Sequence, residues 1–211
     1  MIRYRLDDLG WYQFEWLVQA VLKDHLGIGI ESWGGHGDYG RDAWCSDPLL
    51  FPSKHSMTEG PFLFQAKFIE NANAAGAKPL PSLIGAVKAE MKYVAMRTVK
   101  EEKGVGNCKH YVLITNAVMS PKGRQAVEAE VCSSMPAVGV HCLGGSDICD
   151  LLDGNSAIRR SFPQLLSLRD LDVLLDSVVN RDLVERSSAA ISSTTRFTKR
   201  RVTRTTSGAL T

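Results

Sequence analysis

Residues 62–69 read FLFQAKFI, and this stretch predicts a β-strand that is buried on one face and partly polar on the other. Side chains alternate along a strand, so the phenylalanines at 62, 64 and 68 fall on one side together with Ala66. Leu63, Gln65 and Lys67 fall on the other side. An amide and an ammonium group, two residues apart, therefore point the same way, where an Asp at the start of a neighbouring strand can meet them.

The flanking segments predict an α/β domain with a central mixed sheet flanked by helices. Apolar residues recur every three or four positions from Trp11 and Phe14 onward, which is typical of one stripe of a helix ending at Gly27. The run HYVLIT is continuously apolar, as in a strand covered by helices on both sides. We expect helices over residues 9–26, 82–98, 121–133 and 146–152, and further strands over 110–115 and 137–143.

Length and composition favour one globular domain with short appendages. The chain has 211 residues, of which 44% are hydrophobic and 23% are charged, enough apolar side chain for a core. Residues 186–211 hold six of the 25 Lys and Arg and none of the 23 Asp and Glu. The remainder is acidic on balance, which argues against strong nonspecific DNA binding by that part alone but leaves room for a metal site built from carboxylates.

Cysteine usage and hydropathy favour a cytoplasmic protein that does not enter a membrane. The five cysteines are odd in number and show no Cys-x-x-Cys spacing, so neither a disulfide framework nor a zinc knuckle is predicted. Apolar runs are short, and the first residues, MIRYRLDD, include acids where a secretory signal would be hydrophobic.

Three segments carry the residue types of a phosphodiester-cleaving metal site. They are Phe14-Glu15 on the first helix, the glycine-rich stretch from Gly34 to Asp42, and Gln65-Ala66-Lys67 on the quoted strand. Carboxylate, amide and main-chain oxygens are the ligands that Mg²⁺ prefers, and a lysine stabilises charge on a phosphate. The predicted ligands are Asp42, Gln65, Glu15 and the main-chain carbonyl of Ala66, with Lys67 as the catalytic cation.

These segments resemble the Mrr-type (type IV) restriction endonucleases of the PD-(D/E)xK nuclease superfamily. The resemblance rests on Phe14-Glu15, on Asp38-Tyr39-Gly40-Arg41-Asp42 and on Gln65-Ala66-Lys67, in that order, and covers roughly residues 9–165. It departs from the family at Arg41, where a hydrophobic residue is usual, and in the long spacer from Asp42 to Gln65. That spacer is interpreted either as a DNA-contacting insertion or as a plain surface loop.

The resemblance implies a restriction-endonuclease-like core and a Mg²⁺-dependent DNA endonuclease, with Mn²⁺ as a substitute ion, in bacterial defence. It also implies DNA as a partner, a homo-oligomer, and an NTPase or sensor partner, since similar modules precede STAND-type NTPases in anti-phage systems. The expected organisation is a nuclease domain over 1–168, a helix or linker over 169–191 and a disordered basic tail over 192–211.

Several alternatives stay open at this level. Asp38 either supports the metal ligands or caps its glycine turn, and His36 is either a general base or a solvated turn residue. Glu15 is either a metal ligand or an exposed helix acid. The spacing Gly35-x-Gly37-x-x-Gly40 matches a dinucleotide fingerprint, but no helical stripe follows it, so we reject that function. The alternative to an enzyme is a catalytically silent nucleic-acid-binding or assembly module of the same fold.

Overall fold

The computed structural model describes residues 4–27, 30–32, 42–53, 55–97, 108–166, 170–171 and 175–181. The chain divides into two units, Met1–Leu166 and Ser167–Thr211. The elements of the first unit, in chain order, are η1 (Leu6–Leu9), α1 (Gly10–Leu26), β1 (Glu31–Ser32), β2 (Ala43–Cys45), β3 (Leu49–Leu50), β4 (Met57–Thr58), β5 (Phe62–Lys67), α2 (Pro79–Arg97), β6 (His110–Thr115), α3 (Pro121–Ser134), β7 (Gly139–Leu143), α4 (Gly145–Asp153), α5 (Ser156–Ser161) and η3 (Pro163–Leu165).

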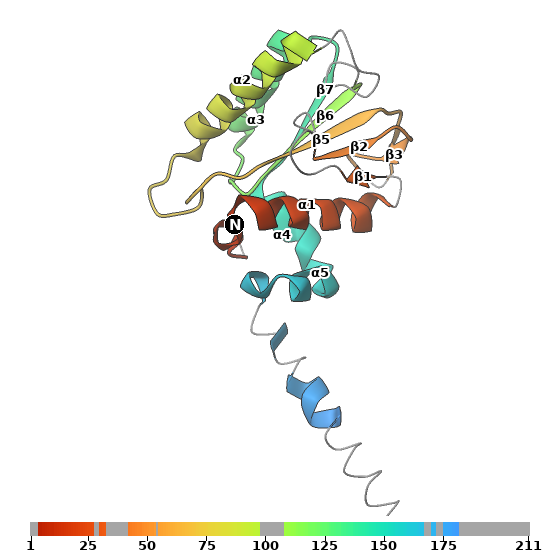
Figure 1. Ribbon diagram of the computed structural model, residues 1–211, viewed down its shortest axis with the longest axis vertical. Coiled ribbons are helices and arrows are strands. Elements are labelled where there is room, and N and C mark those ends of the chain that lie inside the picture. The colour runs from red at the N-terminus through yellow and green to blue at the C-terminus, as the bar shows by residue number, and fades with distance from the viewer. Residues whose placement is uncertain are drawn as a thin grey trace, which may run out of the picture. The chain divides into compact units, whose positions relative to one another are not determined.

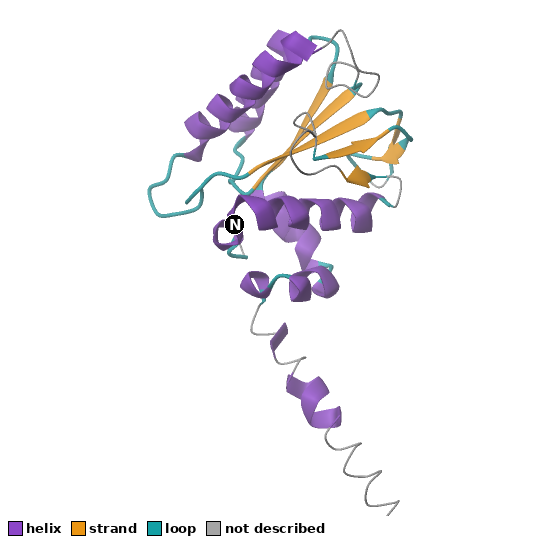
Figure 2. Cartoon of the chain, viewed as in Figure 1, coloured by secondary structure: helices purple, strands orange, loops and turns teal. Residues whose placement is uncertain are grey.

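The main sheet is mixed and has the order β1-β2-β5-β6-β7. β1 and β2 are antiparallel, β2 and β5 are antiparallel, and β5, β6 and β7 run parallel. The parallel pairs are connected through α2 and α3, as parallel strands require a crossover. Figure 1 shows α2 and α3 on one side of the sheet and α1 and α4 on the other, and Figure 2 shows the same layers by secondary structure. The predicted α/β class with a mixed sheet flanked by helices is therefore confirmed.

β5 shows the predicted alternation, but it contributes to the core on both faces of the sheet and not only on the face of its phenylalanines. Phe62 and Phe64 pack with α1 and α4, and their neighbours on that face include Val112 and Ile114 of β6. Leu63 points to the opposite face and packs with α2 and α3. Because both faces are covered, the next position of β5 on the α2 side, Gln65, is a buried polar residue in an apolar layer.

Helix boundaries follow from local chemistry. Gly27 ends α1 with a φ of 105°, a conformation that glycine adopts without steric cost. The Ser120 hydroxyl caps α3 by accepting from Gly123 N at 3.1 Å. α2 begins at Pro79 and not after Ser82, because proline is tolerated in the first turn, where the missing N–H has no helical partner anyway. Trp11 is an exception to the predicted inward stripe, since its side chain is exposed.

The long spacer between Asp42 and Gln65 contains a second, two-stranded sheet, in which β3 and β4 pair antiparallel. It is more than a surface loop, because Leu49 and Phe51 are buried in the core on the α1 side. The Phe51 ring lies 6.0 Å from Phe62 and 4.9 Å from His141, edge to face in both cases.

An amide network fastens the ends of β5 and β6 to the N-terminal turn. The Asn116 side chain accepts from Ile69 N at 2.8 Å and donates to Ile69 O at 2.9 Å and to Asp7 Oδ1 at 2.7 Å. Asp7 Oδ2 also accepts from Asn73 N at 2.9 Å. Asn116 is fully buried, so its loss would leave several polar groups without partners, away from water.

In the second unit, the described residues 170–171 and 175–181 are helical, within the segment where a helix or linker was predicted. The predicted basic tail over 192–211 lies outside the described residues. Among the described helices, none combines the length and the apolar character needed to cross a bilayer. All five cysteines are described, and none of them forms a disulfide bond.

Replacing Asn116 by alanine is predicted to lower the free energy of unfolding by about 3 kcal/mol, because the Ile69 backbone and the Asp7 carboxylate lose their partners. Urea unfolding followed by circular dichroism measures the change. Gln164→Ala is the matched control: it also removes an amide hydrogen bond, to Gln13, but at an exposed position. Equal stability of the two variants would contradict the role given to the network.

Candidate functional site

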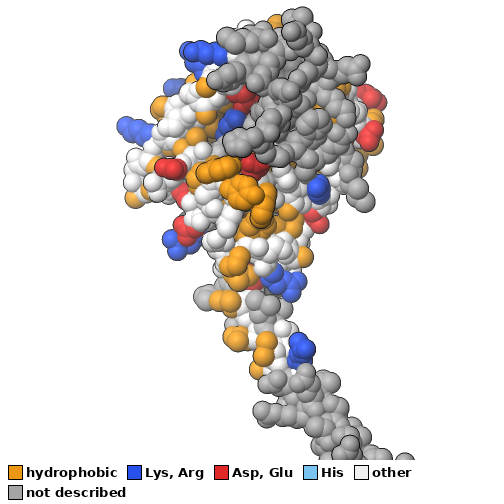
Figure 3. All heavy atoms as spheres, viewed as in Figure 1, with side chains coloured by type: hydrophobic (Ala, Val, Ile, Leu, Met, Phe, Trp, Pro, Cys, Tyr) orange, Lys and Arg blue, Asp and Glu red, His pale blue; other side chains and the backbone are white. Residues whose placement is uncertain are grey.

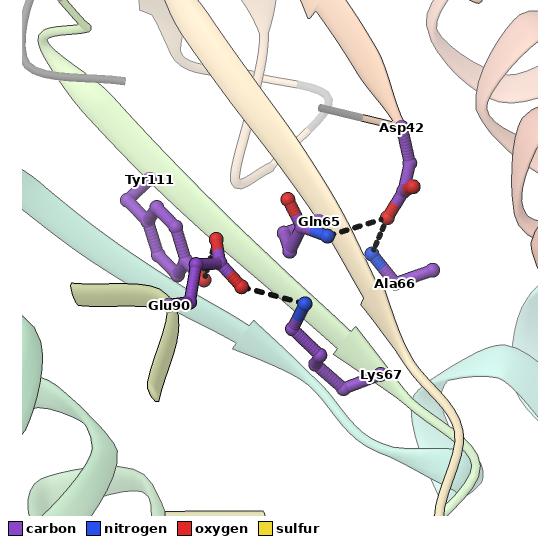
Figure 4. Close-up of polar contacts among 6 residues, drawn as sticks. All are labelled: Asp42, Gln65, Ala66, Lys67, Glu90 and Tyr111. Carbon is purple, nitrogen blue, oxygen red and sulfur yellow. Dashed lines mark hydrogen bonds and ion pairs between the residues drawn. The ribbon is translucent and has the colours of Figure 1, made fainter. Parts of the chain in front are cut away.

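Asp42 and Gln65 meet where β2 begins beside β5. Ala43 pairs with Phe64 in the antiparallel register, and Asp42 N donates to Phe64 O at 3.3 Å, so the aspartate is fixed against the later half of β5. Its Oδ2 accepts from Gln65 Nε2 at 2.9 Å and from Ala66 N. Figure 4 shows both bonds converging on one carboxylate oxygen. Both side chains are buried, with exposed fractions of 7% for Asp42 and 3% for Gln65.

Lys67 lies on the α2 side of the sheet and is paired with a buried acid of α2. Its Nζ is 2.6 Å from Glu90 Oε2. The other oxygen of Glu90 accepts from the hydroxyl of Tyr111, on β6, at 3.1 Å. Tyr111 itself is fully buried. Three elements thus hold the lysine ammonium in place, and Figure 4 shows it directed toward Glu90.

The first helix reaches the same site from the other side. Gln19 Nε2 donates to the main-chain oxygen of Asp42 at 3.3 Å. Glu15 lies one helical turn before Gln19 and therefore on the same side of α1. Its charge contributes to the raised pKa of Asp42.

Burial dominates the electrostatics of the site. The pKa of Asp42 is raised from 3.8 to about 7, and burial is the largest cause. The charges of Glu15 and Glu90 also raise this pKa, whereas the hydrogen bond from Ala66 N and the charge of Lys67 lower it. Burial also raises the pKa of Glu90, against the opposing influence of Lys67 and Tyr111, and raises that of Tyr111 well above its usual value. An added cation would relieve this crowding of carboxylates.

The residues fit a Mg²⁺ ion in the chemistry of their donors. Gln65 Oε1 is buried and accepts no hydrogen bond from the described residues, so the amide whose nitrogen faces Asp42 has an oxygen without a partner. Within the described ranges, no three Asp, Glu, His or Cys side chains gather closely enough to bind a metal by themselves. One or two carboxylates with an amide oxygen and water is nonetheless a usual set for Mg²⁺.

Of the predicted site residues, Asp42 and Gln65 are in direct contact, Lys67 lies two residues further along β5, and Glu15 lies on the side of α1 whose Gln19 contacts Asp42. At Ala66, the predicted ligand was the main-chain carbonyl, and the contact observed with Asp42 is made by the N–H. The predicted Asp38 and His36 lie outside the described residues.

Sequence reasoning missed Glu90, Tyr111 and Gln19. Glu90 had a visible signal, because it lies seven residues after Leu83 and three after Val87, inside the apolar stripe of its helix. An acid in such a stripe is buried and needs a partner. Tyr111 and Gln19 gave no comparable signal, since a tyrosine in an apolar strand and a glutamine on a helix are both ordinary.

A separate cavity of about 360 Å³ lies between α1, α4 and the β3–β4 hairpin. Its described lining is mostly apolar, including Val18, Leu22, Phe51 and Ile148. None of the predicted site residues is part of that lining, so the larger hollow and the polar constellation are different places in the fold.

No family model, curated protein or solved structure matches this chain. What the fold and the site define is a mixed α/β unit that carries a buried, carboxylate-rich polar cluster between a sheet and two helices.

Replacing Asp42 by asparagine is predicted to change how stability depends on pH. The pKa of Asp42 is near 7 in the folded state and 3.8 ordinarily, so the folded state keeps a proton that the unfolded chain releases. The contribution of Asp42 to the free energy of unfolding therefore falls as the pH rises from about 4 to 7, and it is constant above pH 7. Asparagine keeps an acceptor for Ala66 N without this titration.

Urea unfolding between pH 4.5 and 8 tests this expectation. Between these two pH values, the free energy of unfolding of the variant should rise relative to that of the wild type by about 3 kcal/mol. Asp24→Asn, at an exposed position of α1, is the control for the loss of a carboxylate outside the site. A course of Asp42→Asn parallel to that of the wild type would mean that Asp42 is ionised in the folded state throughout.

Proposed function

We propose that this chain is a Mg²⁺-dependent DNA endonuclease with a restriction-endonuclease-like core, acting in bacterial defence against foreign DNA. The observation that carries the proposal is the meeting of Asp42 and Gln65 across β2 and β5, with Lys67 two residues further along β5. The order of the mixed sheet, with a helix before it and crossover helices within it, is compatible with such a core. These are the residues and the order in which the chain resembles Mrr-type nucleases.

Each residue of the site has a role in this reaction. Asp42, Gln65 and Glu15 would hold the ion, with Mn²⁺ as a substitute. The bound ion supplies a Lewis acid that stabilises negative charge on the phosphate and activates water. Water attacks the phosphorus, the bond from phosphorus to the 3′ oxygen breaks, and that oxygen leaves with a proton from solvent.

Lys67 contributes a positive charge at a fixed place. The ion pair with Glu90, and the bond from Tyr111 to Glu90, orient the ammonium before substrate arrives. A preoriented charge stabilises a transition state without the cost of reorganising the site. Glu90 is therefore a positioning residue in the proposal, because it acts through Lys67.

Asp42→Ala and Lys67→Ala are each predicted to abolish cleavage of supercoiled plasmid in Mg²⁺, because the first removes the metal carboxylate and the second the fixed cation. Gel electrophoresis of plasmid with Mg²⁺, with Mn²⁺ and with EDTA measures the activity, and EDTA should stop it. Asp24→Asn serves as the matched control for an acid outside the site. Wild-type rates in either site variant would mean that the site is wrongly placed.

Gln65 is predicted to act through its side-chain oxygen. Gln65→Glu should keep activity or shift the preference from Mg²⁺ to Mn²⁺, because a carboxylate still offers an oxygen at that position. Gln65→Leu, of similar size, should be inactive. Equal activity of the two variants would show that the Gln65 side chain does not touch the metal. A wild-type chain that binds DNA but cuts it under none of these conditions would favour the catalytically silent module instead.

A further inference from the structure

Three aromatic side chains form an exposed patch on the N-terminal half of α1. Trp11, Tyr12 and Trp16 have exposed fractions of 68%, 52% and 53%. The rings of Trp11 and Tyr12 are 5.4 Å apart and inclined at 70°, and those of Tyr12 and Trp16 are 4.7 Å apart and inclined at 47°. Figure 3 shows hydrophobic side chains gathered on this face of the molecule. No pair is stacked face to face, so ring faces remain open to solvent.

The patch differs in kind from the other exposed apolar side chains. The remaining large ones among the described residues are aliphatic or methionine, and every exposed Trp or Tyr of the described part belongs to the patch. Burying large aromatic rings is strongly favourable, so leaving three together in water is costly unless something covers them. Flat rings with open faces are suited to other flat rings.

The patch also borders the candidate site. Trp11, Glu15 and Gln19 follow one another at four-residue spacing, so they form one row along α1. Gln19 contacts the main chain of Asp42, and the charge of Glu15 acts on the Asp42 carboxylate. Tyr12 and Trp16, also four apart, form the adjacent row on the solvent side. The row that begins at Trp11 therefore ends at the contact with Asp42.

We propose that Trp11, Tyr12 and Trp16 form a stacking surface for unpaired nucleobases, so that the substrate of the neighbouring site is single-stranded or locally unpaired DNA. The statement about substrate rests on the proposed nuclease function; the binding of unpaired bases does not. Stacking of bases on aromatic side chains is tolerant of sequence and is available only where bases are not already stacked in a duplex.

Fluorescence anisotropy in EDTA, where no cleavage occurs, tests the proposal with labelled oligothymidine and a blunt duplex of equal length. The wild type should bind oligothymidine more tightly than the duplex. Tyr12→Ala and Trp16→Ala should each weaken oligothymidine binding about tenfold, without changing how affinity depends on salt, because no charge is lost. Met57→Ala, an exposed apolar position on the β3–β4 hairpin, should have no effect.

Two further variants separate stacking from an apolar contact with a protein. Trp16→Phe keeps an aromatic face and should retain most of the affinity, whereas Trp16→Leu should be as weak as Trp16→Ala. Both replacements lie on the helix surface, and circular dichroism checks that they fold. Equal binding by the phenylalanine and leucine variants would overturn the proposal. So would duplex binding as tight as oligothymidine binding, or a wild-type dimer that Trp16→Ala converts to monomer, which would make a second copy the occupant.

The two proposals can fail separately. If the plasmid is cut in a manner that requires Asp42 and the aromatic variants bind oligothymidine normally, the stacking surface is wrong and the nuclease stands. If no plasmid is cut while Trp16→Ala still weakens oligothymidine binding, the stacking surface stands on a module without catalysis.

Discussion

The placement of β5 in the middle of the sheet is the constraint on which the rest of the structure depends. A strand with neighbours on both edges and helices on both faces offers no exposed position, so each of its side chains must find a partner inside the protein. The partners of Phe62, Leu63 and Phe64 are apolar side chains. The polar Gln65 and Lys67 require polar partners, which are Asp42 for Gln65 and Glu90 for Lys67. The polar cluster is therefore a consequence of the same burial that builds the core.

Within the described residues, the cluster contains more acidic than basic side chains, which is unusual for buried groups. Among these residues, Asp42 and Glu90 share one nearby cation, Lys67, and burial raises the pKa of both acids. In a purely structural core, apolar side chains of similar size are often as stable as such buried charges. A metal ion bound as in the proposed function would offset the surplus of acids.

The alternation of β5, the apolar run of β6 and the glycine at the end of α1 were predictable because each depends on neighbours in sequence. The partners of Lys67 were harder, because Glu90 and Tyr111 reach it only after α2 and β6 have packed on β5. Trp11 was assigned to the inward stripe, yet the buried side of α1 is centred on Phe14, Leu17 and Val21, and Trp11 falls at its margin beside Glu15. The periodicity of apolar residues identifies the buried face of a helix but does not show how many residues on either side of that face are buried.

The contacts of the N-terminal turn have a consequence for synthesis on the ribosome. Tyr4 donates to Asp153 at 2.7 Å, and Asp7 accepts from Asn116, so this turn binds partners that are synthesised 149 and 109 residues later. Until then, the apolar side of α1 has no sheet to cover it. Contacts between residues that lie far apart in the sequence slow folding, so aggregation-prone intermediates expose their apolar surface for longer. This protein is therefore expected to depend on chaperones during translation more than a chain of equal length with local contacts.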